Sequence, residues 1–156
     1  MQTYILLKKY NLDFIFFLPT QKNKILDNSY YIKIIYSNQS LTLNGIYYYV
    51  EIPYTKIVNK FNKYYLYFNK KDLANYDNIC EIENQLLNKY SSNKSKELSL
   101  KKQLDSEEFV FYTNSFKEEP TIKFIIKISG LWENKEEIGI THKLIYINRQ
   151  LLQNHP

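Results

Sequence analysis

The segment from Thr121 to Ile147 constrains the fold more than any other part of the chain, because two alternating strands in it flank a short charged turn. Even positions of its first half are apolar, whereas the odd positions include Lys123 and Lys127. Alternate residues of a strand line one face, so this pattern predicts a core face and an outward basic face. The return stretch 138–147 repeats the pattern, and a matching register would add Lys143 to the outward lysines. The segment therefore predicts an antiparallel hairpin.

Short alternating or apolar runs elsewhere predict further strands. They are Tyr4–Tyr10, Phe14–Leu18, Tyr30–Ser37, Leu41–Leu43, Ile46–Ile52, Tyr64–Phe68 and Phe109–Thr113. Asn44–Gly45 is a strong two-residue hairpin signal. We therefore expect Ile46–Ile52 to return alongside Leu41–Leu43.

One stretch, Asp72–Tyr90, changes period, with apolar residues spaced as on one face of a helix. Asp72 is the expected N-cap, because its side chain can accept from free amides of the first turn. The polar, Ser/Lys-rich residues 91–107 fit either a loop or a helix extension, and we favour a loop. One main helix, about 72–90, is therefore expected.

The order of these elements is typical of a mainly β protein with a helix near its middle. It matches an OB-fold-like five-stranded Greek-key barrel, with extra N-terminal strands and one main helix between the third and fourth barrel strands. A β-sandwich with an inserted helix is the competing architecture. At 156 residues, the chain fits one domain over 1–147 followed by a short tail, 148–156.

The positive charge of the chain is concentrated in its first half. Residues 1–70 hold nine lysines and three acidic residues, whereas 71–156 hold twelve basic and thirteen acidic residues. A basic, tyrosine-rich half favours a polyanion with flat faces as partner. Lys, Asn, Ile, Tyr and Phe all have AT-rich codons, so composition alone carries little weight and the positions must decide.

Several classes are disfavoured by the sequence. No apolar run is long enough for a transmembrane helix, and the single cysteine, Cys80, allows no intrachain disulfide. We expect a soluble cytoplasmic protein without a membrane partner. Three glycines cannot build a phosphate loop, and no Cys/His cluster reads as a metal site. His142 lies on the apolar register and is expected to be structural. We therefore expect no enzyme, no cofactor and no metal.

The binding residues suggested by position are lysines and rings on strands. Trp132, the only tryptophan, is expected at the polar turn of the hairpin, where it would be exposed. Lysine meets a phosphate from many angles without the fixed fork of arginine, and an aromatic ring can stack on any base. The predicted contact residues are Trp132, Lys123, Lys127, Lys143, Tyr47, Tyr49, Tyr65 and Lys33. For each tyrosine, covering the core edge is an open alternative.

The hairpin also resembles a known family. Its residues Ile128-Ser129-Gly130-Leu131-Trp132, a charged turn and Gly139-Ile140-Thr141-His142-Lys143 are similar to the C-terminal hairpin of certain single-stranded DNA-binding proteins. These belong to nucleocytoplasmic large DNA viruses, their phage relatives and the cytoplasmic linear killer plasmids of yeasts. The resemblance covers about a tenth of the chain.

The resemblance implies an OB-fold that coats single strands during DNA replication. It implies that Trp132 and Lys143 face the ligand, and that Gly130 and Gly139 shape the hairpin. His142 stands where the family usually has an aromatic residue, which puts stacking there in doubt. The acidic tail that phage members use to recruit replication proteins is missing from the sequence.

Two functions thus remain in view at this point. The first is binding of single-stranded DNA, or RNA, with little sequence preference, with replication proteins as further partners. The second is a structural or interaction β-domain of a virus-like replication or capsid assembly, because tyrosine is favoured at protein interfaces. The sequence leaves the oligomeric state and the site size open.

Overall fold

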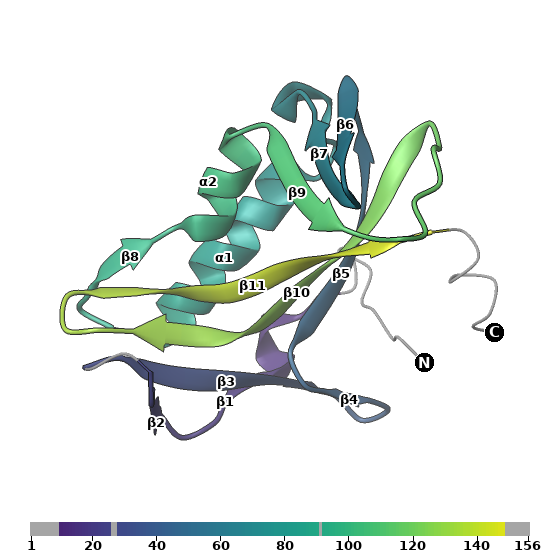
Figure 1. Ribbon diagram of the computed structural model, residues 1–156. Coiled ribbons are helices and arrows are strands. Elements are labelled where there is room, and N and C mark those ends of the chain that lie inside the picture. The colour runs from purple at the N-terminus through teal and green to yellow at the C-terminus, as the bar shows by residue number, and fades with distance from the viewer. Residues whose placement is uncertain (1–9, 26–27, 91, 149–156) are drawn as a thin grey trace.

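The computed structural model of the chain describes residues 10–25, 28–90 and 92–148. It is mainly β, with a strongly curled half-barrel sheet, a smaller sheet and two α-helices (Figure 1). The mainly β, OB-like fold class is therefore confirmed. Of the predicted elements, the strand Tyr4–Tyr10 (except Tyr10) and the tail after Asn148 lie outside the described residues.

The larger sheet has eight strands built around one long ribbon. Its main path runs β1-β3-β10-β11-β8, while β2 and β4 pair with β3, and β5 pairs with β10. The strands are β1 (Ile15–Phe17), β2 (Gln21–Lys22), β3 (Tyr30–Ser37), β4 (Thr42–Leu43), β5 (Ile46–Pro53), β8 (Ser95–Glu97), β10 (Thr121–Glu133) and β11 (Glu137–Ile147). The predicted hairpin is confirmed as β10–β11.

The sheet curls because β10 changes partner along its length. Thr121–Ile128 pair with β5, whereas Gly130–Glu133 pair with β3. The predicted hairpin at Asn44–Gly45 is therefore wrong: β4 pairs with β3, and β5 turns away to β10. Gly45 has a φ of +120°, and a Cβ there would lie 2.6 Å from the carbonyl oxygen of Ile128. This glycine serves a close backbone crossing instead of a two-residue turn.

A second sheet of three antiparallel strands packs beside the first. It consists of β6 (Lys56–Lys60), β7 (Lys63–Tyr67) and β9 (Glu108–Tyr112), in the order β6-β7-β9. The sequence predicted β7 and β9 but missed β6. In Figure 1 this sheet lies toward the end of the β10–β11 ribbon that is away from its turn. Aromatic rings of Phe109 and Phe111 pack edge-on against Phe124 of β10 and join the two sheets.

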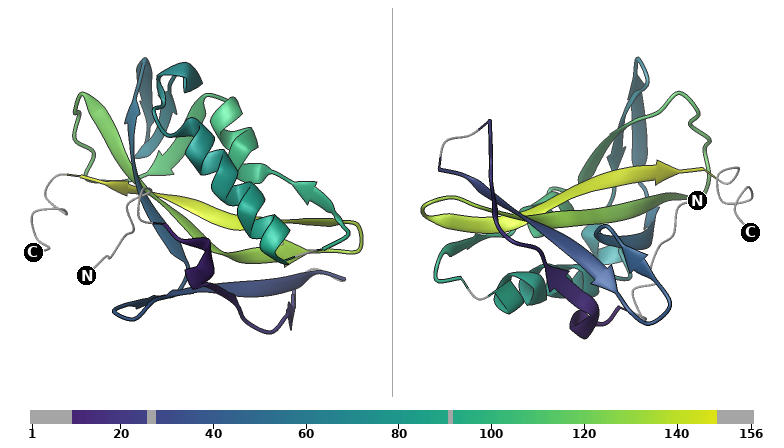
Figure 2. Two further views of the ribbon diagram at one scale, coloured as in Figure 1. Left: turned by 180° about the vertical axis from the view of Figure 1, so that it is seen from behind. Right: turned by 90° about the horizontal axis from the view of Figure 1, so that it is seen from below.

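Two α-helices cover one side of β10–β11. They are α1 (Tyr76–Tyr90) and α2 (Ser99–Asp105). Two short 3-10 turns complete the described part of the chain: η2 (Leu12–Phe14) comes directly before β1, and η3 (Lys70–Asp72) comes shortly before α1. Figure 2 shows both α-helices on the same side of the ribbon. The main helix thus begins four residues later than predicted, and Asp72 lies in η3 and cannot be its N-cap.

The expectation of a loop over 91–107 is wrong, because this segment contains β8 and α2. The cause is a tertiary contact. Glu83 of α1 is fully buried, and its carboxylate accepts hydrogen bonds from the backbone N–H groups of Leu100 (2.9 Å) and Lys101 (3.0 Å). A carboxylate at these free amides caps the helix, and Leu100 and Leu104 bury its apolar side.

Candidate nucleic-acid interface

A bulge in β10 decides which side chains share a face. The pairing with β11 shifts between Ile128 and Gly130, so that Ile128 faces His142 and Gly130 faces Thr141. Odd positions before the bulge therefore share a face with even positions after it. This places Trp132 on the same face as the lysines, although simple alternation would put it on the opposite one.

Trp132 lies within strand β10 and not in the turn, so the predicted position at the turn is wrong. The turn is shorter than expected because the Asn134 side chain accepts from the backbone N–H groups of Glu136 (2.9 Å) and Glu137 (2.7 Å). This tight turn lets the strand continue to Glu133. Trp132 is half-buried there.

Cross-strand pairing assembles most of the predicted residues side by side. Lys127 faces Tyr47 on one neighbour and Lys143 on the other, and residues directly opposite each other point to the same face. Gly130 faces Lys33, and Trp132 faces Tyr31. We call this side of β10–β11, away from α1 and α2, the open face. Its residues are Tyr31, Lys33, Tyr47, Tyr49, Lys123, Lys127, Gly130, Trp132, Gly139, Thr141 and Lys143.

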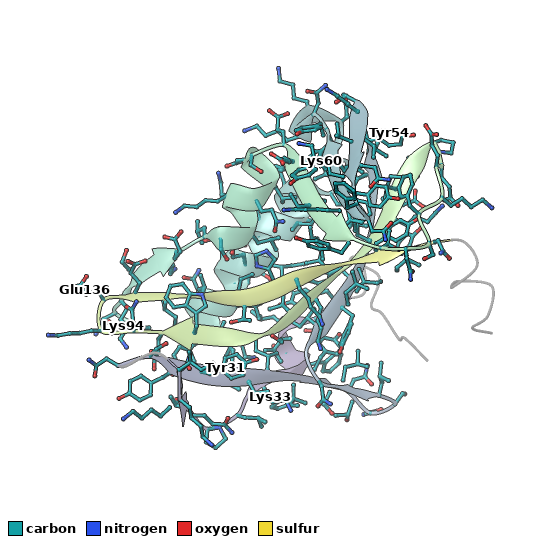
Figure 3. The ribbon with its side chains drawn as sticks, in the orientation of Figure 1. Tyr31, Lys33, Tyr54, Lys60, Lys94 and Glu136 are labelled. Carbon is teal, nitrogen blue, oxygen red and sulfur yellow. The ribbon has the colours of Figure 1, made fainter. Side chains whose placement is uncertain are left out.

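Two glycines let aromatic rings lie against the open face. A Cβ on Gly139 would stand 2.7 Å from ring atoms of Trp132, and a Cβ on Gly130 would stand 2.7 Å from the ring end of Tyr31. The Trp132 ring therefore occupies space that another residue would fill with its own side chain. Gly130 makes room both for the Tyr31 ring and for the carbonyl oxygen of Ile32, with which a Cβ there would clash. Figure 3 shows Tyr31 and Lys33 on β3, beneath β10.

The charges in the middle of the open face are not neutralised by any described residue. Lys127 and Lys143 stand directly opposite each other. Within the described part of the chain, neither ammonium group nor that of Lys33 is within 4.0 Å of a carboxylate. The Lys127 ammonium lies 5.3 Å from the centre of the Tyr47 ring, at which range a cation is attracted to the ring.

The end of the face near Lys123 is different in character. Lys123 forms a largely buried ion pair with Glu119 (2.6 Å). Glu51 lies opposite Lys123 and accepts a hydrogen bond from the Tyr49 hydroxyl (2.7 Å). Ile125, between these rows, is almost fully buried. Lys123 and Tyr49 are therefore engaged in local structure, and the uncommitted cations lie from Lys127 toward Trp132.

Tyr65 is the one predicted contact residue that lies elsewhere, since it belongs to β7 of the small sheet. Conversely, sequence reasoning missed Tyr31. The alternation within Tyr30–Ser37 places Tyr31 on the same face as Lys33, and that signal was present in the sequence.

The helix side of the ribbon carries the remaining polar groups of interest. His142 Nε2 is 2.8 Å from Gln103 Oε1 of α2, and burial lowers the pKa of His142 below its usual value. Its structural position agrees with the prediction. Burial also raises the pKa of the Cys80 thiol. Among the described residues, no three His, Cys, Asp or Glu side chains are grouped to hold a metal ion.

Helix hydropathy and comparisons with known proteins assign no function to the chain. No helix in the described ranges is long and apolar enough to cross a membrane. No protein-family model matches the sequence, and the searches of curated proteins and of solved structures return no match.

Proposed function

We propose that this protein binds single-stranded nucleic acid, single-stranded DNA in the first place, on the open face and with little sequence preference. The observation that carries the proposal is the pair Lys127 and Lys143, which are directly opposed and have no carboxylate within 4.0 Å among the residues that the structure describes. Like charges directly opposite on a sheet are destabilising. A phosphate between them would relieve that repulsion.

The rings beside the lysines suit an unpaired base. Trp132 on β10 and Tyr31 on β3 stand directly opposite each other. Base–aromatic stacking contributes about 1–3 kcal/mol per base. Gly139, which the Trp132 ring covers, lies four positions before Lys143 on β11, and this corresponds to about 13 Å along the strand. Phosphate and base contacts can therefore be made by the same short stretch of chain.

A carboxylate limits where a polyanion can run. Glu51 stands opposite Lys123 at one end of the open face, whereas Glu97 of β8 is paired with Lys102 of α2 on the helix side. The rows with Lys33, Lys127 and Lys143 lie beyond the Glu51 end. We therefore propose that the strand crosses the open face at these rows.

The lysines favour coating over reading of a sequence, because they lack the bidentate geometry that arginine offers to guanine. Together with the resemblance of the hairpin, this supports a non-catalytic role in covering exposed strands during DNA replication in the cytoplasm. Replication proteins are then the expected further partners.

The test is a titration of labelled dT30, rU30 and duplex DNA over a series of salt concentrations. The double variant Lys127→Gln/Lys143→Gln is expected to bind dT30 more weakly at low salt. Each lost phosphate contact on a single strand lowers the slope of log K against log salt by about 0.7, so the double variant should lose about 1.4. Short dT6 should quench Trp132 fluorescence in the wild type.

Lys71→Gln is the matched control, because Lys71 is an exposed lysine on η3 outside the open face. It should leave the affinity nearly unchanged. An unchanged salt slope in the double variant, together with unquenched Trp132, would refute binding on the open face.

A further inference from the structure

The small sheet has an outer face that resembles the open face in chemistry but not in location. In β7, Tyr64 and Leu66 are buried, whereas Lys63, Tyr65 and Tyr67 point the other way. Directly opposite partners on β6 and β9 share that outer side. We call it the hairpin face. It consists of Lys56, Val58, Lys60, Phe61, Lys63, Tyr65, Tyr67, Glu108, Val110 and Tyr112.

Phe61, at the tip of the β6–β7 hairpin, is the most unusual residue of this face. Its side chain is fully exposed, at 103% relative accessibility. Phe61 and Asn62 both have positive φ, 53° and 64°, the conformation of a type I′ turn, for which Asn and Gly are preferred. A bulky residue with positive φ is strained. Phe61 therefore costs stability without adding to the core.

Behind the tip lie lysines interleaved with rings. Lys60 and Lys63 stand directly opposite each other. The Lys63 ammonium is 5.2 Å from the centre of the Tyr65 ring and 5.7 Å from that of Tyr112, and Lys60 is 5.5 Å from Tyr65. Tyr112 is 71% exposed.

The charge of the hairpin face is almost entirely of one sign. None of its three lysines has a carboxylate within 4.0 Å in the described part of the chain. Glu108, opposite Tyr67, is its one acidic residue. A surface with three cations, exposed rings and one carboxylate is complementary to a polyanion with flat faces.

Most of this surface is separate from the open face. Its strands form a separate sheet, and Figure 3 places Lys60 at the top of the view and Tyr31 and Lys33 at the bottom. The two surfaces meet where Lys143 lines one pocket with Val110 and Tyr112. Figure 2 shows the β6–β7 hairpin extending away from the β10–β11 ribbon in both views.

We infer that the hairpin face is a second contact surface for single-stranded nucleic acid, with Phe61 as a stacking residue at its tip. The inference shares its ligand class with the proposed function but rests on different residues. A strand long enough to leave the open face would be held by Lys60 and Lys63, with bases on Phe61, Tyr65 or Tyr112. Stacking of a base on Phe61 then offsets the stability that its strained backbone costs.

Phe61→Asn is the decisive variant, because binding and stability should move in opposite directions. Asparagine tolerates positive φ, so the midpoint of thermal unfolding should rise. Affinity for dT30 should fall by about 5- to 150-fold, the equivalent of one lost stacking contact. Quenching of Trp132 by dT6 should be unchanged, because Trp132 reports on the open face alone.

Asn62→Gly is the matched control at the same turn. Glycine relieves strain at the neighbouring position while Phe61 is kept, so stability should rise and affinity for dT30 should stay at the wild-type value. Lys60→Gln/Lys63→Gln should reduce the salt slope for dT30 by about 1.4, two single-strand phosphate contacts.

Each outcome separates this inference from the proposed function. Wild-type affinity of Phe61→Asn for dT30 would overturn the inference, whatever the open-face variants do. Loss of affinity in Phe61→Asn, with Lys127→Gln/Lys143→Gln unaffected, would support it and reject the proposed function. Displacement of dT30 from Lys127→Gln/Lys143→Gln by poly-glutamate of equal charge would also overturn the inference. An acidic protein would then be the better partner for the hairpin face.

Discussion

The β10–β11 ribbon has two faces on one backbone, and the two differ in how well their side chains are packed and paired. On the helix side, Phe124, Ile126 and Ile128 are fully buried, and His142 is paired with Gln103. On the open face, Lys127 and Lys143 oppose each other and two strand glycines lie beneath rings. One face uses its residues for stability, and the other keeps features that cost stability.

This contrast indicates which variants should affect folding and which should affect binding. A repulsive pair of cations or a glycine inside a strand weakens a sheet, and a purely structural surface has no need of either. If the open face binds a strand, variants there should trade affinity against stability. Variants on the helix side should change stability alone.

The largest effect is expected on the helix side, at Glu83. In Glu83→Leu the buried N–H group of Leu100 and the partly buried N–H group of Lys101 lose their acceptor. Each unsatisfied buried donor costs about 1–3 kcal/mol, so we expect a loss of about 2–4 kcal/mol in the free energy of unfolding. Urea denaturation measures this, and affinity of the folded protein for dT30 should be unchanged.

Glu81→Leu provides the control, because Glu81 lies on the same helix but is exposed. A loss of under about 0.5 kcal/mol is expected there, as for most surface substitutions. Equal losses in the two variants would contradict the capping role of Glu83.

The pH dependence of stability gives a second test of Glu83 on the helix side. Burial raises the pKa of Glu83 above its usual value, despite the lowering effect of the two backbone donors. The folded protein therefore holds this proton more tightly than the unfolded chain does. The linked contribution to stability is full below the usual carboxyl pKa and declines as pH rises from there to the raised value. Measured against Glu83→Gln, which cannot titrate, the wild type should lose stability as pH increases through that window.

The two faces also differ in how far the sequence predicts them. Strict alternation predicted the core side of β10–β11 and the outward direction of Lys127 and Lys143, because period 2 follows directly from strand geometry. The bulge after Ile128 was not visible in the pattern, so the face on which Trp132 lies could not be predicted from alternation. A bulge adds one residue without changing composition.

Long-range contacts explain the other errors. The polar segment 91–107 has only Leu100 and Leu104 at helical spacing, which is too short a stripe to predict a helix. The cap of α2 comes from Glu83, 17 residues before Leu100. The Asn44–Gly45 pair matched a hairpin turn, but Gly45 is needed where the backbone approaches Ile128. Local propensity is a weak guide when a tertiary contact competes with it.

On the open face, Gly139→Ala should have a moderate effect. The added Cβ would stand 2.7 Å from the Trp132 ring, so the ring must move off the sheet. Overpacking of this kind costs about 1–3 kcal/mol. We expect lower stability, a shift of the Trp132 emission maximum and weaker quenching by dT6.

Thr141→Ala is the control for Gly139→Ala, because Thr141 lies on the same face and strand and is half-exposed, whereas Gly139 is buried. It adds no atoms near the ring and should leave the emission maximum in place. An unchanged Trp132 spectrum in Gly139→Ala would show that the ring does not depend on the glycine.

The smallest effect expected is also the one that best separates the two faces. Lys143→Gln removes one of two directly opposed cations, so the free energy of unfolding should rise by about 0.2–1 kcal/mol. Affinity for dT30 should fall in the same protein, with about 0.7 lost from the salt slope. Lys71→Gln should change neither quantity. A Lys143→Gln variant that is less stable than the wild type would mean that the two ammonium groups do not repel each other, and a phosphate between them would then relieve no repulsion.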